Sequence, residues 1–189
     1  MYRKDLRPEI VDSFIAEFNE FGPKLTLDRV SSRIHISKKT IYRFFRSKDE
    51  IYSYILKQAA RDVAMGQKAV LEDSSLSPAE KVRRILTVET LWESKIDISK
   101  VAELTEEAPG IAKEILEAYH ASWDAVRQAL NDAKEKGVVR PEVNVDLLLT
   151  YLEASMKSLY SSKVLKEQHL SYTQAISALA SIVVDGILA

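Results

Sequence analysis

Apolar residues recur every three to four positions along almost the whole chain, and this helical period constrains the fold more than any other feature. The first apolar stripe consists of Ile10, Val11, Phe14, Ile15, Phe18 and Phe21. The pair Gly22-Pro23 ends it, as Gly followed by Pro commonly ends a helix. No segment alternates polar and apolar residues as a strand would. The valines between residues 138 and 145 favour a strand, but Pro141 divides them. The sequence therefore predicts an all-α fold of about nine helices.

Capping residues in the sequence mark where several of the helices begin. Ser47 and Ser77 are each followed three residues later by Glu, the pattern of a capping box. Ser37 is a good N-cap for a short helix through about Phe45. The helices are expected over residues 10–21, 26–34, 37–45, 47 to beyond 63, 77–92, 99–105, 109–136, 145–162 and 172–188.

Positive charge gathers in one short stretch of the chain. Between Pro23 and Lys48 there are eight Lys or Arg residues and one acid, Asp28, although the whole chain of 189 residues has a net charge of −1. Residues 1–48 have a net charge of +5 and residues 49–189 a net charge of −6. We therefore predict a small N-terminal three-helix head over residues 1–48 and a larger helical body over residues 49–189, with a polyanion as the partner of the head.

The expected helix from Ser37 to Phe45 suits the major groove of DNA. Ile41 and Phe45 lie four residues apart and can anchor one face of it. The side chains left to face outward are those of Lys38, Lys39, Thr40, Tyr42 and Arg43. Such donors can bind phosphates and the edges of bases. The head is therefore predicted to form a helix-turn-helix that binds double-stranded DNA.

This segment resembles the head of the tetracycline-repressor (TetR) family of bacterial regulators. The residues in register with the family pattern are Thr26, Leu27, Val30, Ser31, Ile36, Ser37, Thr40, Ile41, Tyr42, Phe45, Ser47, Lys48, Asp49, Glu50 and Ile51. The chain departs from the pattern at His35, where the family usually has Gly in the turn, and at Lys39 and Phe44. We expect His35 to adopt a positive φ with modest strain.

The resemblance implies a set of DNA-binding residues: Thr26, Ser37, Lys38, Lys39, Thr40, Tyr42, Arg43 and Lys48. Within this set, Thr26, Lys38, Thr40, Tyr42 and Lys48 are expected at phosphates. Lys38, Lys39 and Arg43 are candidates for base edges, because long donors reach guanine in the major groove.

The resemblance also implies a homodimer through the last two helices, a palindromic operator and a small effector that releases the protein from DNA. Residues expected to line an effector pocket are Trp92, Tyr119, His120, Trp123 and Tyr151. Ordinary core packing stays open as the alternative for each of them. The identity of the effector, the operator and the regulated genes, and the choice between repression and activation, are not readable from the sequence.

Other classes of protein have little support. There is no cysteine, no paired metal-binding histidines and no Gly-rich phosphate loop, so we expect no catalytic residues, metal or cofactor. The longest apolar stretch, from Ala175 to Val184, is too short for a membrane span, and no leader peptide is expected, which favours the cytoplasm. Two rivals remain: a TetR-like protein-interaction module or co-activator, and, less favoured, a helical enzyme or carrier.

Overall fold

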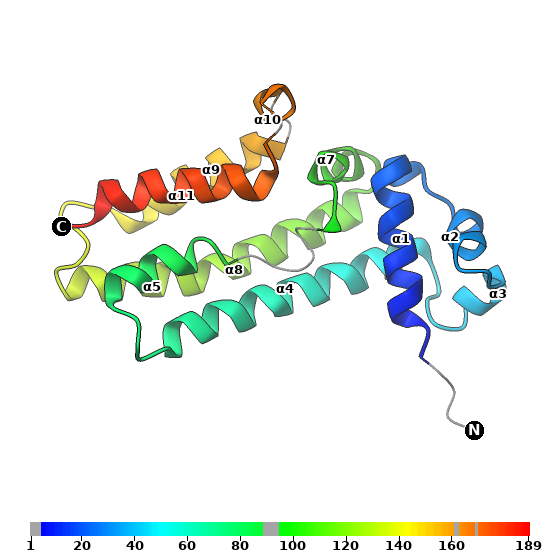
Figure 1. Cartoon of the computed structure of the whole chain (residues 1–189), viewed down its shortest axis with the longest axis horizontal. Helices are drawn as coiled ribbons and strands as arrows, with labels where there is room; N and C mark the ends of the chain where they lie inside the picture. The colour runs from blue at the N-terminus through cyan, green and yellow to red at the C-terminus, as the bar shows by residue number, and fades with distance from the viewer. Residues whose placement is uncertain (1–4, 89–94, 161–162, 169) are drawn as a thin grey trace. The chain divides into compact units, whose positions relative to one another are not determined.

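The polar breaks of the sequence separate the helices of the structure, a computed structural model that describes residues 5–88, 95–160, 163–168 and 170–189 (Figure 1). The helices are α1 Arg7–Phe21, the 3₁₀ helix η1 Gly22–Lys24, α2 Leu27–Arg33, α3 Lys38–Ile41, α4 Lys48–Glu72, α5 Pro78–Ile85, α7 Ile98–Glu107, α8 Pro109–Glu135, α9 Val145–Tyr160, α10 Lys163–Glu167 and α11 Tyr172–Ile187. Within the described ranges no strand forms, although Val139 and Leu188 make one isolated antiparallel bridge. The predicted all-α class is confirmed.

Both predicted capping boxes lie at helix starts, but only one closes in the predicted way. At α5, Ser77 Oγ accepts from the Glu80 amide while Glu80 accepts from the Ser77 amide at 2.8 Å. At α4, Ser47 Oγ accepts from the Glu50 amide at 3.1 Å. Glu50 Oε2, however, accepts from the amide of Arg46 at 2.5 Å, one residue before the cap. Helix α4 still begins at Lys48, directly after Ser47, and only the contact of the Glu50 carboxylate differs from the predicted pattern.

The helix expected from Ser37 to Phe45 is shorter than predicted. The α-helix α3 ends at Ile41. Tighter turns follow, in which the amides of Arg43 and Phe44 donate to carbonyls three residues back, at 3.2 and 2.9 Å. The amide of Phe45 donates to the carbonyl of Ile41 at 3.0 Å, so Phe45 still returns to the core as expected. Helix α5 likewise ends at Ile85, short of the predicted 92, and Trp92 lies outside the described residues.

The chain forms two compact units. The first unit consists of Met1–Gln58 and Lys95–Leu116, and the second of Ala59–Ser94 and Glu117–Ala189. The boundaries between the units fall inside α4 and α8. The division at residue 48 into a DNA-binding and a regulatory domain concerns function and stays a prediction.

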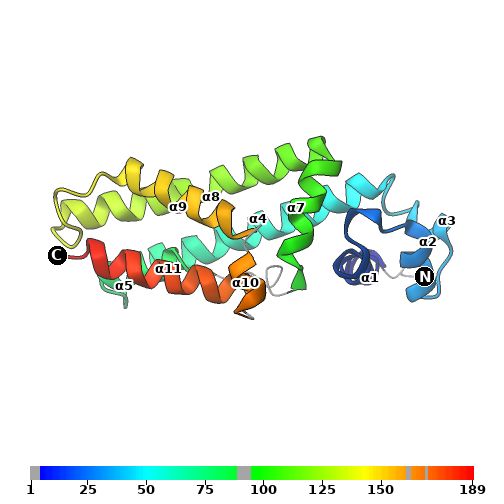
Figure 2. The ribbon, with the colours of Figure 1, turned by 90° about the horizontal axis from the view of Figure 1, so that it is seen from above.

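The first unit is built around the apolar face of α1. Ile10 and Phe14 are fully buried, and the ring of Tyr52 from α4 meets Phe14 edge-on at 4.8 Å between centroids. The hydroxyl of Ser13 donates to the carbonyl of Val30 at 3.0 Å and ties α1 to α2. Figures 1 and 2 show α2 beside α1, with α3 following it. The predicted anchors Ile41 and Phe45 are buried in this unit, together with Leu27, Val30, Ile51 and Ile55.

The second unit packs α5, α8, α9 and α11 around one apolar core (Figure 2). The core includes Trp123 and Leu130 from α8, Leu149 from α9 and Val184 from α11. Helices α9 and α11 lie side by side. Among the residues that the structure describes, no helix combines the length and the hydropathy needed to cross a bilayer.

Candidate DNA-binding surface

Two capped helices and a tight turn form the centre of the surface. Thr26 Oγ1 accepts from the Arg29 amide at the start of α2, and Ser37 Oγ accepts from the Thr40 amide at 3.1 Å at the start of α3. Both caps belong to the predicted DNA-binding set. The amide of Ile36 donates to the carbonyl of Ser31 at 3.0 Å and closes the turn. The local sequence thus specifies the helix-turn-helix through hydrogen bonds that do not depend on distant residues.

His35 occupies the left-handed region at the turn, with φ of 54°. The predicted positive φ is confirmed. In the described part of the chain, His35 is the one residue other than glycine with such a φ. A side chain with a Cβ is strained in this region, so the turn keeps its shape at the expense of some stability.

The α3 segment divides its side chains as predicted. Ile41 and Phe45 are 0% and 2% exposed, whereas Lys38, Lys39 and Arg43 are exposed and Tyr42 is 49% exposed. The hydroxyl of Thr40 is half-buried and shares a hydrogen bond of 2.8 Å with Ser37 Oγ. The outward face of α3, defined here as Lys38, Lys39, Tyr42 and Arg43, therefore carries three cations and one aromatic hydroxyl.

One of these cations has an acidic partner. Lys38 Nζ lies 2.8 Å from Asp28 Oδ2, and both side chains are well exposed, at 43% and 70%. The hydrogen bond that Lys38 donates to Asp28 raises the pKa of Lys38. The sequence marks Asp28 as the one acid of the cationic stretch but not its contact with Lys38.

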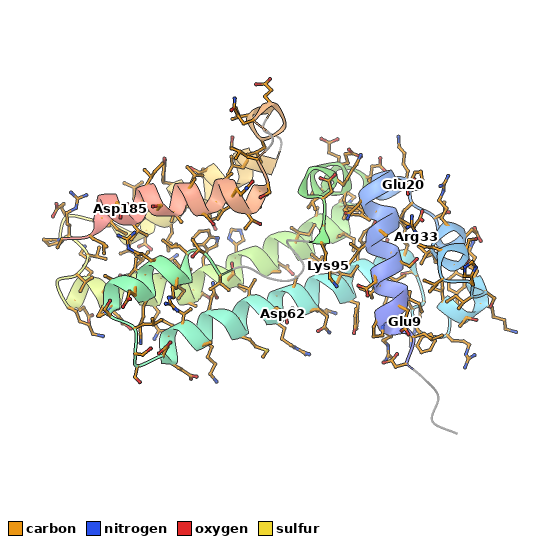
Figure 3. The ribbon with its side chains drawn as sticks, in the orientation of Figure 1. Glu9, Glu20, Arg33, Asp62, Lys95 and Asp185 are labelled. Atoms are coloured by element: carbon orange, nitrogen blue, oxygen red, sulfur yellow. The ribbon has the colours of Figure 1, made fainter. Side chains whose placement is uncertain are left out.

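Arg33, at the end of α2, is held by two acids of α1. Its Nε lies 2.7 Å from Glu17 Oε1 and its Nη2 lies 3.1 Å from Glu20 Oε2 (Figure 3, where Glu20 and Arg33 are labelled beside each other). Glu17 is only 4% exposed, and the hydrogen bond with Glu17 raises the pKa of Arg33. Glu17 lies in the apolar run of the first helix with nothing in its spacing to mark it as a partner of Arg33. This cation therefore supports the fold of the head and is not free for DNA.

The remaining cations of the stretch differ in their contacts. Arg29 stacks on the Phe21 ring, with 3.9 Å from its Cζ to the ring centroid. Lys48, predicted to contact a phosphate, instead donates from its Nζ to the carbonyl of Pro23 in η1 at 2.7 Å. This hydrogen bond connects the start of α4 to η1. Within the described ranges no ion pair involves the side chains of Lys24, Lys39, Arg43 and Arg46. Some of the cations in the stretch from Pro23 to Lys48 thus form contacts within the head, as Arg33 and Lys48 do.

The segment before α7 is fastened to α1 inside the first unit. The side-chain amide of Asn19 donates to the carbonyl of Lys95 at 2.7 Å and accepts from the amide of Asp97 at 2.8 Å. Lys95 Nζ lies 3.2 Å from Asp12 Oδ1. Gly22 has φ of 60°, and a Cβ there would stand 2.8 Å from a carboxylate oxygen of Glu103 in α7. The end of the Glu103 side chain could shift to admit a Cβ, so it is the left-handed backbone at Gly22 that favours glycine here.

The residues predicted for an effector pocket lie in different environments. Trp123 is buried in the core of the second unit, and Tyr151 is 57% exposed on α9. His120 is exposed, with Nδ1 3.1 Å from Glu153 Oε1. Trp92 and the side chain of Tyr119 lie outside what the structure describes. The pocket stays a prediction.

Helices α9 and α11 present exposed apolar and small residues to solvent. On α9, Leu147 is 68% and Tyr151 57% exposed, and on α11, Ile182 is 70% exposed. We define this set as the α9–α11 stripe: Leu147, Tyr151, Ala154 and Ser158 on α9, and Ala178, Ser181, Ile182 and Gly186 on α11. Its spacing of three, four or seven residues places each helix's share on one face.

The described ranges hold no group of three or more His, Asp or Glu side chains that could bind a metal ion.

Comparison with known proteins agrees with this geometry. Residues 10–55 match the model of the family described as bacterial regulatory proteins, tetR family. The uncharacterized HTH-type transcriptional regulator YvaF of Bacillus subtilis (strain 168) is 22% identical over 180 residues, covering 89% of this chain and 88% of that protein.

Two solved structures show the same fold over nearly the whole chain. A putative TetR-family transcriptional regulator from Rhodococcus sp. superposes with a TM-score of 0.75 at 13% identity, covering 97% of this chain and 99% of that chain. The regulator FadR of Bacillus subtilis, solved in complex with stearoyl-CoA, superposes with a TM-score of 0.70 at 14% identity, covering 95% of this chain and 98% of that chain.

The matched segment, residues 10–55, contains α1, α2, the turn at His35 and α3. Through this segment the chain is similar to the tetR family of DNA-binding transcriptional regulators, and over nearly its whole length it shares the all-α fold of a structure described as a TetR-family regulator.

Proposed function

We propose that this regulator acts as a homodimeric repressor that binds a palindromic operator and leaves it when a small effector binds. The observation that carries the proposal is the outward face of α3. Lys39, Tyr42 and Arg43 point away from a core that Ile41 and Phe45 anchor. A short helix with this division of side chains fits the major groove, where lysine and arginine bind guanine edges.

The contacts described above refine the predicted DNA-binding set. Lys39 and Arg43 are the best candidates for base edges, because no ion pair holds their side chains among the described residues. Tyr42, whose side chain is exposed, is proposed as a phosphate contact. Thr26 and Ser37 contribute by capping α2 and α3, and their hydroxyls stay within reach of a phosphate at the helix starts.

The test is a titration of duplex DNA selected by the protein from a random-sequence pool, followed over a series of salt concentrations. We expect the logarithm of the binding constant to fall linearly with the logarithm of the salt concentration. The selected sequences should form an inverted repeat whose half-sites match two heads. A protein that binds no duplex at low salt, or that captures a protein without DNA, favours the interaction-module alternative.

The proposed dimer rests on the α9–α11 stripe. A surface helix of a monomer usually exposes polar residues on the side away from its core. Ile182 at 70% exposure, flanked by Ala178, Ser181 and Gly186, allows a second copy to pack closely. A twofold pair of such faces would be self-complementary, which is what a C₂ dimer requires.

Release by an effector needs a mechanical link to the head, and Asn19 supplies a candidate. Its amide holds the backbone of Lys95 and Asp97 on both sides, so movement of this segment would pull on α1. That the same fold in FadR holds stearoyl-CoA supports a small-molecule effector for this chain.

The link can be tested after a ligand screen that follows tryptophan fluorescence. A compound that releases DNA from the unmodified protein should release it less effectively from the Asn19→Ala variant, while both variants bind DNA equally without the compound. Equal release from both would remove Asn19 from the mechanism.

A further inference from the structure

The acid of the cationic stretch lies against the first residue of α3. Asp28 Oδ2 and Lys38 Nζ are 2.8 Å apart, on α2 and α3 respectively. The pair carries no net charge, so one of the three cations on the outward face of α3 is neutralised before any DNA arrives. The hydrogen bond raises the pKa of Lys38, so the ammonium stays charged over the physiological range.

The fold of the head does not depend on the Asp28 carboxylate. Thr26 already caps α2, and it is the backbone carbonyl of Asp28 that accepts from Ser31 Oγ at 2.9 Å. An acid in the first turn of a helix adds only a modest favourable interaction with the helix dipole at an exposed site. The side chain is 70% exposed, and among the described residues its one ion pair is with Lys38.

The Arg33 pair shows what a structural ion pair looks like in the same unit. Glu17 is 4% exposed and keeps Arg33 against α1, where separation would leave a carboxylate without water. Asp28 and Lys38 are both well exposed, so water replaces either partner readily. The Lys38 pair can therefore open on binding, whereas the Arg33 pair cannot.

We propose that Asp28 sets the strength of DNA binding, because it neutralises Lys38 in the free protein and competes with a DNA phosphate for the Lys38 ammonium group. The inference rests on the proposed function. Affinity for duplex DNA comes largely from the release of counterions by cations that neutralise phosphates. A lysine already paired with a carboxylate contributes little to that release, and the carboxylate itself repels the phosphate.

The experiment compares the unmodified protein with Asp28→Asn on the selected duplex over a series of salt concentrations. Asparagine keeps the size of the aspartate side chain but removes its charge. We expect Asp28→Asn to bind roughly five- to tenfold more tightly per subunit near 0.1 M salt, with a salt slope steeper by about 0.9 per subunit.

The role of Lys38 is tested in the Lys38→Met background, where no ammonium is left to release. The gain from Asp28→Asn should be at least about threefold smaller there than in the unmodified background, since a shared interaction makes the two changes non-additive. Equal gains in both backgrounds would mean that Asp28 acts only through net charge, and would overturn the claim that it competes for Lys38.

The matched control is Asp12→Asn. Asp12 is also an exposed aspartate of the first unit in an ion pair, with Lys95 at 3.2 Å. Lys95 lies across α1 from Arg33 in Figure 3, away from α2. The same charge change there should alter the affinity by less than about twofold, since screening at physiological salt limits interactions between exposed charges beyond roughly 8 Å.

The outcomes separate the inference from the proposed function. If the unmodified protein binds the selected duplex and Asp28→Asn binds it equally or more weakly, the inference is overturned while the function stands. If the unmodified protein binds no duplex at low salt, the proposed function fails and the inference fails with it. Thermal unfolding of each variant checks that the head stays folded.

Discussion

The outward face of α3 and the α9–α11 stripe are both exposed, but their chemistry is opposite. The first gathers Lys38, Lys39 and Arg43 around one tyrosine, and the second gathers aliphatic and small side chains around Ile182. Single exposed apolar residues are ordinary, whereas a row of them along two adjacent helices calls for a partner. The difference indicates that the two faces suit different partners, which in our proposal are a polyanion for the first face and a second copy of the chain for the second.

The largest effect is expected from Lys39→Ala combined with Arg43→Ala. Removing one side chain that binds a base edge should weaken DNA binding roughly ten- to a hundredfold, and a dimer carries each substitution twice. Titration of the selected duplex measures the weakening. Sedimentation should show that the variant is still a dimer, because the α9–α11 stripe is untouched.

The control for this variant is Lys57→Ala combined with Arg61→Ala. These two residues are also an exposed Lys and Arg four positions apart on one helix, α4. Their removal should change the affinity much less. If both double variants weaken DNA binding by the same factor, binding depends on net charge alone, and the proposed role of the α3 segment is contradicted.

A smaller effect is expected from Ile182→Glu. Burying an uncompensated charge at a dimer interface costs about 3–5 kcal/mol, so the protein should sediment as a monomer at concentrations where the unmodified protein is a dimer. DNA binding should weaken as a consequence, with α3 intact. Met65→Glu, at a position 64% exposed on α4, is the control and should leave the dimer in place. A dimer that survives Ile182→Glu would refute the stripe as its interface.

Third in size is the difference between Arg33→Ala and Lys38→Ala in thermal unfolding. Arg33→Ala should lower the Tm more, because it leaves the buried Glu17 carboxylate without its partner, whereas Asp28 at 70% exposure regains water. Adding Glu17→Gln to Arg33→Ala should recover part of the loss. Equal Tm values for Arg33→Ala and Lys38→Ala would contradict the distinction between the two ion pairs.

The smallest effect is expected at the turn. His35→Gly should raise the free energy of unfolding by about 0.5–1 kcal/mol, since relief of the strained left-handed conformation exceeds the added entropy of the unfolded chain. His35→Ala removes the imidazole but keeps the Cβ, so it should give no such gain. Chemical denaturation measures both. A gain in His35→Ala as large as that in His35→Gly would place the effect in the imidazole and not in the backbone.

Much of the head was predictable because its determinants are local. Ile41 and Phe45 were expected to be buried by their spacing, Ser37 was expected to cap a helix, and His35 was expected to take a positive φ; each of these is observed. A cap or a turn involves residues within a few positions of one another, so a single stretch of sequence contains the whole interaction.

The partners of the cations were not predictable in this way. Glu17 binds Arg33 across 16 positions, and Lys48 binds the carbonyl of Pro23 across 25. Asn19 holds residues 95 and 97 from positions 76 and 78 away. Nothing in the spacing of these residues reveals such interactions, because they form only when helices distant in sequence pack together.

The sequence alone determined the helical class, the position of the helix-turn-helix and the face that α3 turns outward, since period, capping and turn chemistry act over one or two turns of helix. Only the tertiary structure decided which cations of that head are available. Charge can be counted in a sequence, but whether a cation pairs with Glu17, with Asp28 or with solvent depends on how α1, α2 and α3 pack in space.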